Sequence, residues 1–320
     1  MRKSLLAIAL SVVAMTTAAA AAEDYPARPI KIVVSTSAGG ITDVVARLLG
    51  HYITARTGQT VVIDNRTGAG GNIAMDAVAK SPPDGYTLGV ANTGNIVINP
   101  YLYRSMPYDP LQDLVPVGSM GEVPLFMVVN GKFPATGLQE FVAYAKSHPV
   151  SYGSAGTGTT PHLAADAFNR HTGLNMVHVP YRGSTAATMD VISGTIPMTF
   201  VSLGQYIDLV RQGTLRVLGI ASTRRVAYLP DVATFAEQGF PGLETGTWFA
   251  LFAPRGTPPE IVDQLNGYVR ALTDDAESRK RLDAAYLEPM PMTAPEFATQ
   301  VKADAVKWAR IVRESGVKQN

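Results

Sequence analysis

The amino-acid sequence predicts an α/β protein with two lobes and a ligand cleft between them. Two observations lead to this prediction. Short apolar strands alternate with helical patterns along most of the chain, which is typical of a parallel, doubly wound sheet. The alternation also falls into two blocks, and 320 residues with 46% apolar content are enough for about two domains with cores of their own.

The chain begins with a segment that has the features of a secretory signal peptide, residues 1–22. Two basic residues, Arg2 and Lys3, precede an apolar run, and alanines supply the small side chains that favour cleavage near Ala22. The apolar run is shorter than the ~20 residues that a membrane-spanning helix needs. Export is therefore expected, and because the sequence contains no cysteine, neither disulfides nor a lipid anchor should form.

The first block shows successive strand-to-helix patterns. Ile41, Val44, Val45 and Leu48 recur at helical spacing, which predicts that a helix begins directly after two glycines. The strands are short and β-branched, as in a sheet that is buried on both faces. The elements expected in this block are strands at 30–34, 60–64 and 86–92 and helices that begin at 41 and 72.

The second block repeats the alternation. Its expected elements are strands at 125–129, 150–154, 176–179, 197–201 and 216–221, with helices at 138–147 and 161–172. After Gly246 the chain shows one more strand, a proline-rich turn, and a helix that begins after Pro258 and Pro259.

The remaining sequence is too short for a third α/β domain, so we expect it to pack back on the first lobe. Lobe I is then predicted to comprise residues 23–124 and 247–320, and lobe II residues 125–246. Two chain crossings, near 122–126 and 245–249, would form the hinge. Small ligands commonly bind in the cleft of such a body.

Each predicted lobe contains a glycine-rich turn that leads into a helix. The first four amides of a helix lack intrahelical partners, and the positive end of its dipole lies there, so such turns favour an anion. In the second turn Thr160 is the expected N-cap, with Pro161 at the first helical position. One carboxylate could be held from both sides by two groups of residues: Ser37, Ala38, Gly39, Gly40, Thr42 and Asp43, and Ser154, Ala155, Gly156, Thr157, Gly158 and Thr159.

The sequence leaves two interpretations open for each of several candidate residues. Asp43 either orders its loop or fixes a water or ligand ammonium, and His162 either donates to a bound carboxylate or makes a local hydrogen bond. Asn92 follows a strand and either binds ligand or completes a turn. Arg182, in a third strand-to-helix turn, either clamps a distal carboxylate or is a solvated or interlobe residue. Trp248, at the second crossing, is expected to pack in the hinge rather than touch ligand.

Other chemistries are disfavoured by the same stretches of sequence. The P-loop pattern has Thr159 where Lys is required, the dinucleotide pattern has Ile73 where its third glycine belongs, and the nucleophile elbow has Tyr152 in place of a glycine. The five histidines lack metal spacing, so no metal, cofactor or catalytic residue is predicted. An exported hydrolase using Ser154 with His162 stays as a rival hypothesis, without an identifiable orienting acid.

The net charge of the mature chain indicates whether nucleic acid is an expected partner. Loss of Arg2 and Lys3 reduces the 27 basic residues to 25, against 26 acidic residues, which is a net charge of −1. The chain has no dense basic run, so nucleic acid is not an expected partner.

The motifs YPARPIKIVV, SAGGITDVVARLL, PPDGYTL, YGSAGTGTTPHLAADAF, HVPYRG and FAPRGTPPEIVDQLN occur in the order and spacing of the Bug family. The sequence resembles these extracytoplasmic solute receptors of tripartite tricarboxylate transporters over nearly the whole mature chain. The resemblance implies a type II periplasmic binding protein fold, a periplasmic location, no enzymatic activity, and a monomer that passes a small carboxylate to two membrane subunits. It also implies that loops 37–43 and 154–159 grip the carboxylate, with His162 at the border of the pocket.

Two departures from the family pattern affect the expected ligand. Ser35, Thr36 and Ser37 stand where proline and aromatic residues are common, which implies a smaller and more polar wall. The loop around Ser202, a further candidate ligand-binding residue, lacks the aspartate that many relatives carry after the strand. An organic acid is therefore expected rather than an amino acid. A sensing role as the partner of a membrane kinase remains an alternative to transport.

Overall fold

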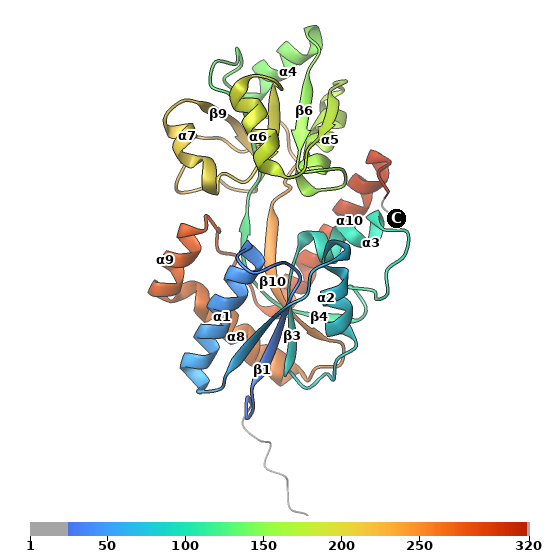
Figure 1. The fold of residues 1–320 in the computed structure, drawn as a ribbon, viewed down its shortest axis with the longest axis vertical. Helices are drawn as coiled ribbons and strands as arrows, with labels where there is room; N and C mark the ends of the chain where they lie inside the picture. Colours follow the sequence, from blue (N-terminus) through green and yellow to red (C-terminus); the bar gives the residue numbers. More distant parts are fainter. Residues whose placement is uncertain (1–24, 319–320) are drawn as a thin grey trace, which may run out of the picture.

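The computed structural model describes residues 25–318 and contains two five-stranded sheets, one in each of two lobes (Figure 1). The strand order is β2-β1-β3-β10-β4 in lobe I and β7-β6-β8-β5-β9 in lobe II. The predicted signal peptide, residues 1–22, lies outside the described residues. Among residues 25–318, no helix combines the length and the hydropathy that a membrane span requires.

The sheet of lobe I is mixed rather than parallel throughout. β1 pairs in parallel with β2 and β3, whereas β10 is antiparallel to both β3 and β4. The expectation of a parallel sheet is wrong here because β10 brings the chain back from lobe II and therefore runs antiparallel to β3 and β4. The strands are β1 (Ile30–Val34), β2 (Val61–Asn65), β3 (Thr87–Asn92), β4 (Leu114–Val123) and β10 (Thr247–Pro254).

Helices cover both faces of this sheet. Alternate residues of a strand point to opposite faces, so Ile32 packs toward α1 and α8 while Val33 packs toward α2 and α10. Phe297 and Trp308 of α10 are fully or almost fully buried in the second core. The helices of lobe I are α1 (Ile41–Thr57), α2 (Asn72–Ala79), α3 (Asn99–Leu102), α8 (Pro259–Asp274), α9 (Ala276–Ala284) and α10 (Ala294–Ser315).

Lobe II has the same layered construction on a smaller scale. β5 is antiparallel to β8 and β9 because it leaves the hinge, whereas its neighbours run toward it. The helices α4 (Leu138–Ser147) and α5 (Thr160–Thr172) cover one face, and α6 (Ser184–Ser193) and α7 (Ile207–Arg211) cover the other. The strands are β5 (Phe126–Asn130), β6 (Ser151–Ser154), β7 (Val177–Pro180), β8 (Met198–Val201) and β9 (Leu215–Ile220).

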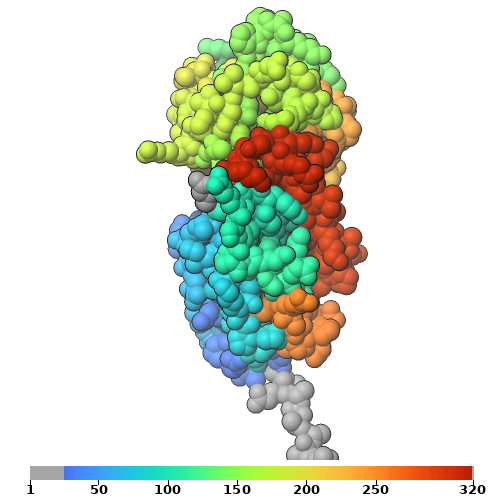
Figure 2. Space-filling model, turned by 90° about the vertical axis from the view of Figure 1, so that its right-hand side faces the viewer, coloured from blue at the N-terminus to red at the C-terminus, as the bar shows by residue number. Residues whose placement is uncertain are grey.

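The chain passes between the lobes where β4 leads to β5 and where the segment before β10 returns. The Ser222 hydroxyl donates to the Glu122 carboxylate at 3.2 Å across this junction. Trp248, which was predicted to pack in the hinge, packs inside the core of lobe I: it is 2% exposed, and its indole Nε1 donates to Asp304 at 2.9 Å. The C-terminal helix α10 lies across the junction and contacts α5 of lobe II (Figure 2).

Candidate functional site

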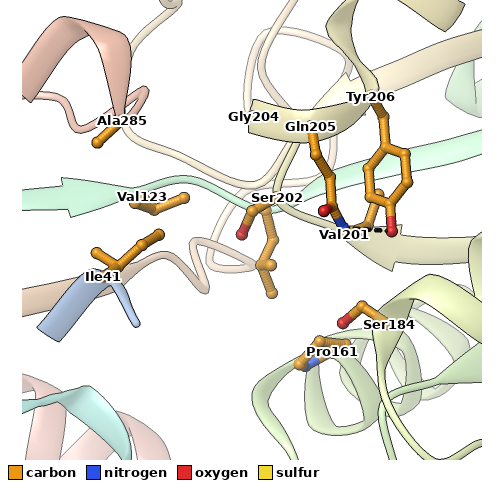
Figure 3. Close-up of a pocket in the computed structure, with 11 residues that line it drawn as sticks. Ile41, Val123, Pro161, Ser184, Val201, Ser202, Gly204, Gln205, Tyr206 and Ala285 are labelled. Carbon is orange, nitrogen blue, oxygen red and sulfur yellow. Dashed lines mark hydrogen bonds between the residues drawn. The ribbon is translucent and has the colours of Figure 1, made fainter. Parts of the chain in front are cut away.

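A cavity of about 390 Å³ lies where the two lobes meet the hinge (Figure 3). Lobe I contributes the start of α1 and the end of α9, and lobe II contributes the starts of α5 and α6 and the segment after β8. Val123 and Leu125, on either side of Pro124, contribute the hinge wall. The eleven lining residues are Ile41, Val123, Leu125, Pro161, Ser184, Val201, Ser202, Gly204, Gln205, Tyr206 and Ala285.

Three helices begin at this cavity. Ile41 and Ser184 are the first residues of α1 and α6, and Pro161 is the second residue of α5. The N-cap residues of these three helices, Gly40, Thr159 and Gly183, make no side-chain cap hydrogen bond. The positive ends of three helix dipoles therefore meet at one cavity from both lobes.

In lobe I, hydrogen bonds to the Asp43 carboxylate stabilise the glycine loop. Its Oδ2 accepts from the Gly39 amide and from Arg47 Nε, each at 2.9 Å, and its Oδ1 accepts from Asn65 Nδ2 at 2.9 Å. Asn65 also donates to the Thr36 carbonyl at 2.9 Å. The hydrogen bond from Arg47 is the largest of the interactions that lower the Asp43 pKa to about 2. These bonds assign to Asp43 the role of ordering its loop.

In lobe II, the corresponding loop is held by neutral groups. The buried Ser154 hydroxyl lies 2.7 Å from His178 Nε2 and also accepts from the Gly156 amide at 3.1 Å. The Gly158 amide donates to His162 Nδ1 at 3.0 Å. The two histidine rings stack, with centroids 3.8 Å apart.

Burial keeps this histidine pair neutral. Desolvation, followed by the neighbouring His178, lowers the pKa of His162 to about 4, and nearby Asp166 opposes the shift only in part. Desolvation likewise lowers the pKa of His178. A neutral His162 can accept the hydrogen bond from the loop amide of Gly158, which an imidazolium cannot do. Of the two interpretations of His162, the structure shows the local hydrogen bond.

The pairing required by the hydrolase hypothesis is wrong. Ser154 Oγ contacts His178 rather than His162. The parallel pairing of β6 with β7 places Tyr152 opposite His178, and Ser154, two residues further along β6, lies on the same face of the sheet as Tyr152. The Ser154 side chain is also fully buried at 0% exposure, so a substrate carbonyl cannot approach its hydroxyl. Within residues 25–318, no group of three or more potential metal-binding side chains occurs.

The predicted site residues lie in different environments. Ser202 alone among them is one of the eleven lining residues. The first loop reaches the cavity through Ile41, which lies within residues 37–43, and the second through Pro161, which lies two residues beyond Thr159. Thr42, Asp43, Ser154, Gly158 and His162 are buried, Gly40, Asn92, Ala155, Gly156 and Thr159 are half-buried, and Ser37, Ala38, Gly39 and Thr157 are exposed.

The structure shows the environments of four further residues that the sequence analysis discussed: Asn92, Ser35, Arg182 and Thr160. Asn92 makes turn contacts with Asn95, and Ser35 is buried against Asn95 Oδ1 at 2.9 Å instead of lining the cavity. Arg182 is exposed and is not a lining residue. Thr159, rather than Thr160, is the N-cap of α5. Thr159 is extended, and its hydroxyl donates to the Gly156 carbonyl at 2.7 Å instead of capping an amide.

Several residues that line the cavity were not predicted from the sequence. Ser184 follows Gly183 at a third glycine-to-helix junction, so the signal was present, but the interpretation of that turn concentrated on Arg182. Gln205 and Tyr206 follow Ser202 in a short helical turn, and the Gln205 amide donates to the Tyr206 hydroxyl at 2.6 Å (Figure 3). No sequence pattern distinguishes these two residues from ordinary loop residues.

Comparisons with known proteins agree on one family. Its sequence profile, described as "Tripartite tricarboxylate transporter family receptor", matches residues 45–317. Protein BugT of Bordetella pertussis is 36% identical over 300 residues, covering 93% of this chain and 92% of BugT. Among solved structures, R. palustris Rpa4515 with adipate is 35% identical, with a TM-score of 0.76 and coverage of 92% and 99%. MatC from Rhodopseudomonas palustris with bound malate is 32% identical, with a TM-score of 0.72 and coverage of 90% and 100%.

Proposed function

This chain belongs to the tripartite tricarboxylate transporter receptor family, and from that premise we propose that it captures a small organic acid by its carboxylate and delivers it to the membrane subunits of such a transporter. The chain is a periplasmic solute-binding protein of the Bug type, and its family consists of receptors rather than enzymes. The proposed receptor acts as a monomer after removal of residues 1–22.

One observation carries the proposal: three helices, whose N-cap residues make no side-chain cap hydrogen bond, begin at a single interlobe cavity. A carboxylate there accepts hydrogen bonds from backbone amides and lies at the positive ends of the helix dipoles. This arrangement binds an anion without a charged side chain in the lining.

The two glycine loops supply the remaining contacts in this proposal. Gly39, Gly156 and Gly158 have positive φ angles of 87°, 130° and 80°, which bring the backbone into turns that other residues rarely adopt. The contacting groups are those expected from the sequence in loops 37–43 and 154–159, together with Ser202. Asp43 and His162 support the loops from behind, because their polar atoms already bond to loop amides.

Thermal unfolding of the protein recovered from the periplasm tests this function. Its intact mass should correspond to a chain that begins at Glu23. A bound acid at a hundredfold its Kd should stabilise the fold by about 2.7 kcal/mol and raise Tm by about 5 °C. The panel contains mono-, di- and tricarboxylates, with the matching alcohols as uncharged controls. Equal shifts for acids and alcohols, or no shift with any acid and no co-purified acid in the denatured eluate, would contradict the proposal.

A matched pair of variants separates loss of binding from loss of folding. Ser184→Asp places a carboxylate at the first position of α6, where the helix dipole favours it, so the unliganded fold should keep its Tm or gain slightly. The new charge should weaken acid binding at least ~10-fold, because like charges ~4 Å apart repel. Ser184→Asn has nearly the same shape without the charge and should bind almost normally. Equal binding by both variants would place the carboxylate elsewhere.

A further inference from the structure

We propose that Tyr286 is a positioning residue of the binding site, which holds the lining segment 202–206 of lobe II against lobe I. Ser202 of that segment is a candidate binding residue, and Gly204 lines the same cavity. Tyr286 itself is not among the eleven lining residues, so its ring acts on the ligand through this segment. The inference rests on the proposed function, since it concerns how tightly the cavity binds an acid.

The backbone of Tyr286, which directly follows the C-cap residue of α9, has a φ angle of 55°, a conformation that suits glycine. The Tyr286 amide donates to the Asp283 carbonyl at 2.9 Å. The next amide, of Leu287, donates to the Leu282 carbonyl at 3.0 Å. This pair of bonds forms a Schellman motif, in which glycine is the usual residue at this position because a side chain strains a left-handed backbone. A bulky residue in such a conformation is an exception that points to a use for its side chain.

At this turn, adjacent side chains pack into the cores of different lobes. Leu287 is 1% exposed and belongs to the core that α1 and α8 form with the lobe I sheet. Tyr286 packs instead against the lobe II core that contains Phe126. Its ring contacts the Tyr228 ring edge-to-face, with centroids 5.0 Å apart. One short segment, residues 285–289, therefore joins both lobes beside the cavity.

The Tyr286 ring also packs on the backbone of the cavity lining. A Cβ atom added to Gly204 would lie 3.2 Å from Tyr286 Cδ2, so the absence of a side chain at Gly204 permits this close approach. Leu203, the preceding residue, is 1% exposed in the same lobe II core. Gln205 and Tyr206, which follow, line the cavity. Tyr286 therefore restrains the backbone that carries the lobe II side of the lining.

Other hydrogen bonds fix the rest of segment 285–289 to the hinge and to lobe II. The Glu288 amide donates to the Glu122 carbonyl at 2.7 Å, and the Glu122 amide donates to the Glu288 carbonyl at 2.8 Å. On the lobe II side, the Arg224 side chain donates to the Pro289 carbonyl at 2.7 Å. None of these bonds involves the side chain before Leu287, so they remain when that side chain is replaced. Substitutions there test the ring rather than the path of the chain.

Isothermal titration tests the role of the ring. Titration with acetate, succinate, adipate, malate and citrate identifies an acid that binds the wild type, and the same acid is then titrated into three variants. Tyr286→Gly and Tyr286→Asn remove the ring and suit a left-handed backbone, whereas Tyr286→Phe keeps the ring and lacks only the hydroxyl. The Kd should rise at least ~5-fold in the first two variants, because the aromatic contact that favours closed lobes is lost, and less than ~2-fold in Tyr286→Phe.

Thermal unfolding without acid separates this role from a merely structural one. Glycine and asparagine relieve the backbone strain, which offsets the loss of ring packing. The unliganded Tm of both variants should therefore stay within ~3 °C of the wild type. A ring that served only stability would lower the Tm of both variants and leave their Kd unchanged, and that result would overturn the inference.

The distance between the lobes is a measurement that does not depend on the acid. The chain contains no cysteine, so Ala55→Cys in α1 and Ala143→Cys in α4 can each carry a spin label at an exposed position, one in each lobe. Double electron–electron resonance without acid should give a longer or broader distance distribution for Tyr286→Gly than for the wild type and Tyr286→Phe. Identical distributions in all three proteins would contradict the positioning role.

The failures are distinguishable. If no acid binds the wild type, the proposed function fails, and the spin-label distances alone decide whether Tyr286 holds the lobes together. If an acid binds the wild type and Tyr286→Gly with equal affinity, the proposed function stands and the inference is overturned. An equal loss of affinity in Tyr286→Phe would also overturn it, because that variant keeps the ring.

Discussion

The glycine loops of the two lobes have the same backbone design but different supports. In lobe I the loop amide of Gly39 bonds to the charged Asp43, whose partner Arg47 is 48% exposed at its side chain. In lobe II the loop amide of Gly158 bonds to a neutral ring nitrogen of His162, which is 5% exposed and stacks on His178. One loop depends on a buried carboxylate paired with a half-exposed arginine, and the other on a buried aromatic pair.

This difference shows that two loops with the same backbone geometry can be stabilised by different side-chain interactions. Surface ion pairs are screened by solvent and contribute little, typically 0 to ~1 kcal/mol. Buried neutral hydrogen bonds are costly to break, because the remaining partner loses its only substitute for water. The lobe II loop should therefore be the more sensitive of the two to mutation and to mild acid.

The largest expected effect comes from His162→Ala. It removes the acceptor of the Gly158 amide and the ring that stacks on His178, which should lower the free energy of unfolding by about 3 kcal/mol. His162→Asn is the matched control, because its amide oxygen can accept the same bond. It should recover part of the loss in chemical denaturation. Equal destabilisation by both variants would show that the hydrogen bond contributes nothing.

The next effect is a loss of stability in mild acid. The pKa of His162 lies at about 4 in the folded protein, below its ordinary value of 6.5, so the unfolded chain binds a proton that the folded chain excludes. Stability is complete above pH ~6.5 and falls as the pH approaches 4, by at most ~3 kcal/mol. His178, whose pKa is also lowered, contributes in the same direction.

The difference between wild type and His162→Asn isolates this contribution. Denaturation of both proteins from pH 7.5 to 4 should show a shallower decline for the variant, because Asn does not titrate. Parallel curves would contradict the neutral state of His162. The lowered pKa of Asp43 predicts a separate loss in both proteins, between about pH 4 and pH 2.

A smaller effect is expected from Asp43→Ala in lobe I. The Gly39 amide, the Asn65 side chain and Arg47 all lose an acceptor, but Arg47 and the loop are open to water that can replace it. We expect a loss of ~1–2 kcal/mol in denaturation, and weaker acid binding because the loop is less ordered. Asp43→Asn, which keeps an acceptor, should lose less. If Asp43→Ala lowered the free energy of unfolding by more than His162→Ala does, the Asp43 interactions would stabilise the fold more than those of His162.

The smallest effect is expected from Arg47→Gln. The ion pair with Asp43 is half-exposed on the arginine side, so its removal should cost less than ~1 kcal/mol and the cost should shrink in high salt. Denaturation at 0.05 M and 1 M salt measures both quantities. A cost of several kcal/mol that is independent of salt would mean that the pair behaves as a buried one.

The sequence predicted most elements, since their periodicity is local. α4 has the expected bounds, and β1 also matches residue for residue. β4 was not predicted, because Pro116, Gly118 and Gly121 interrupt its apolar pattern. The structure accommodates these residues with register shifts against β10. The lobe boundaries at 124/125 and 246/247 remain predictions.

The site was less accessible to sequence reasoning, because its contacts join distant segments. The glycine loops were recognised from their own residues, but the Ser154 and His178 pair forms only through the pairing of two strands. Ala285 and Ser184 are far apart in sequence and line one cavity through the arrangement of the lobes. The roles of the predicted loop residues in binding are still proposals.

A crystal structure of the protein with its tightest-binding acid would show which groups hold the carboxylate. We expect carboxylate oxygens within ~2.7–3.2 Å of backbone amides at the starts of α1 and α5, so that both lobes hold the same group. No arginine or lysine side chain should contact that carboxylate. A carboxylate paired with such a side chain, or held by one lobe alone, would contradict anion binding by helix starts from both lobes.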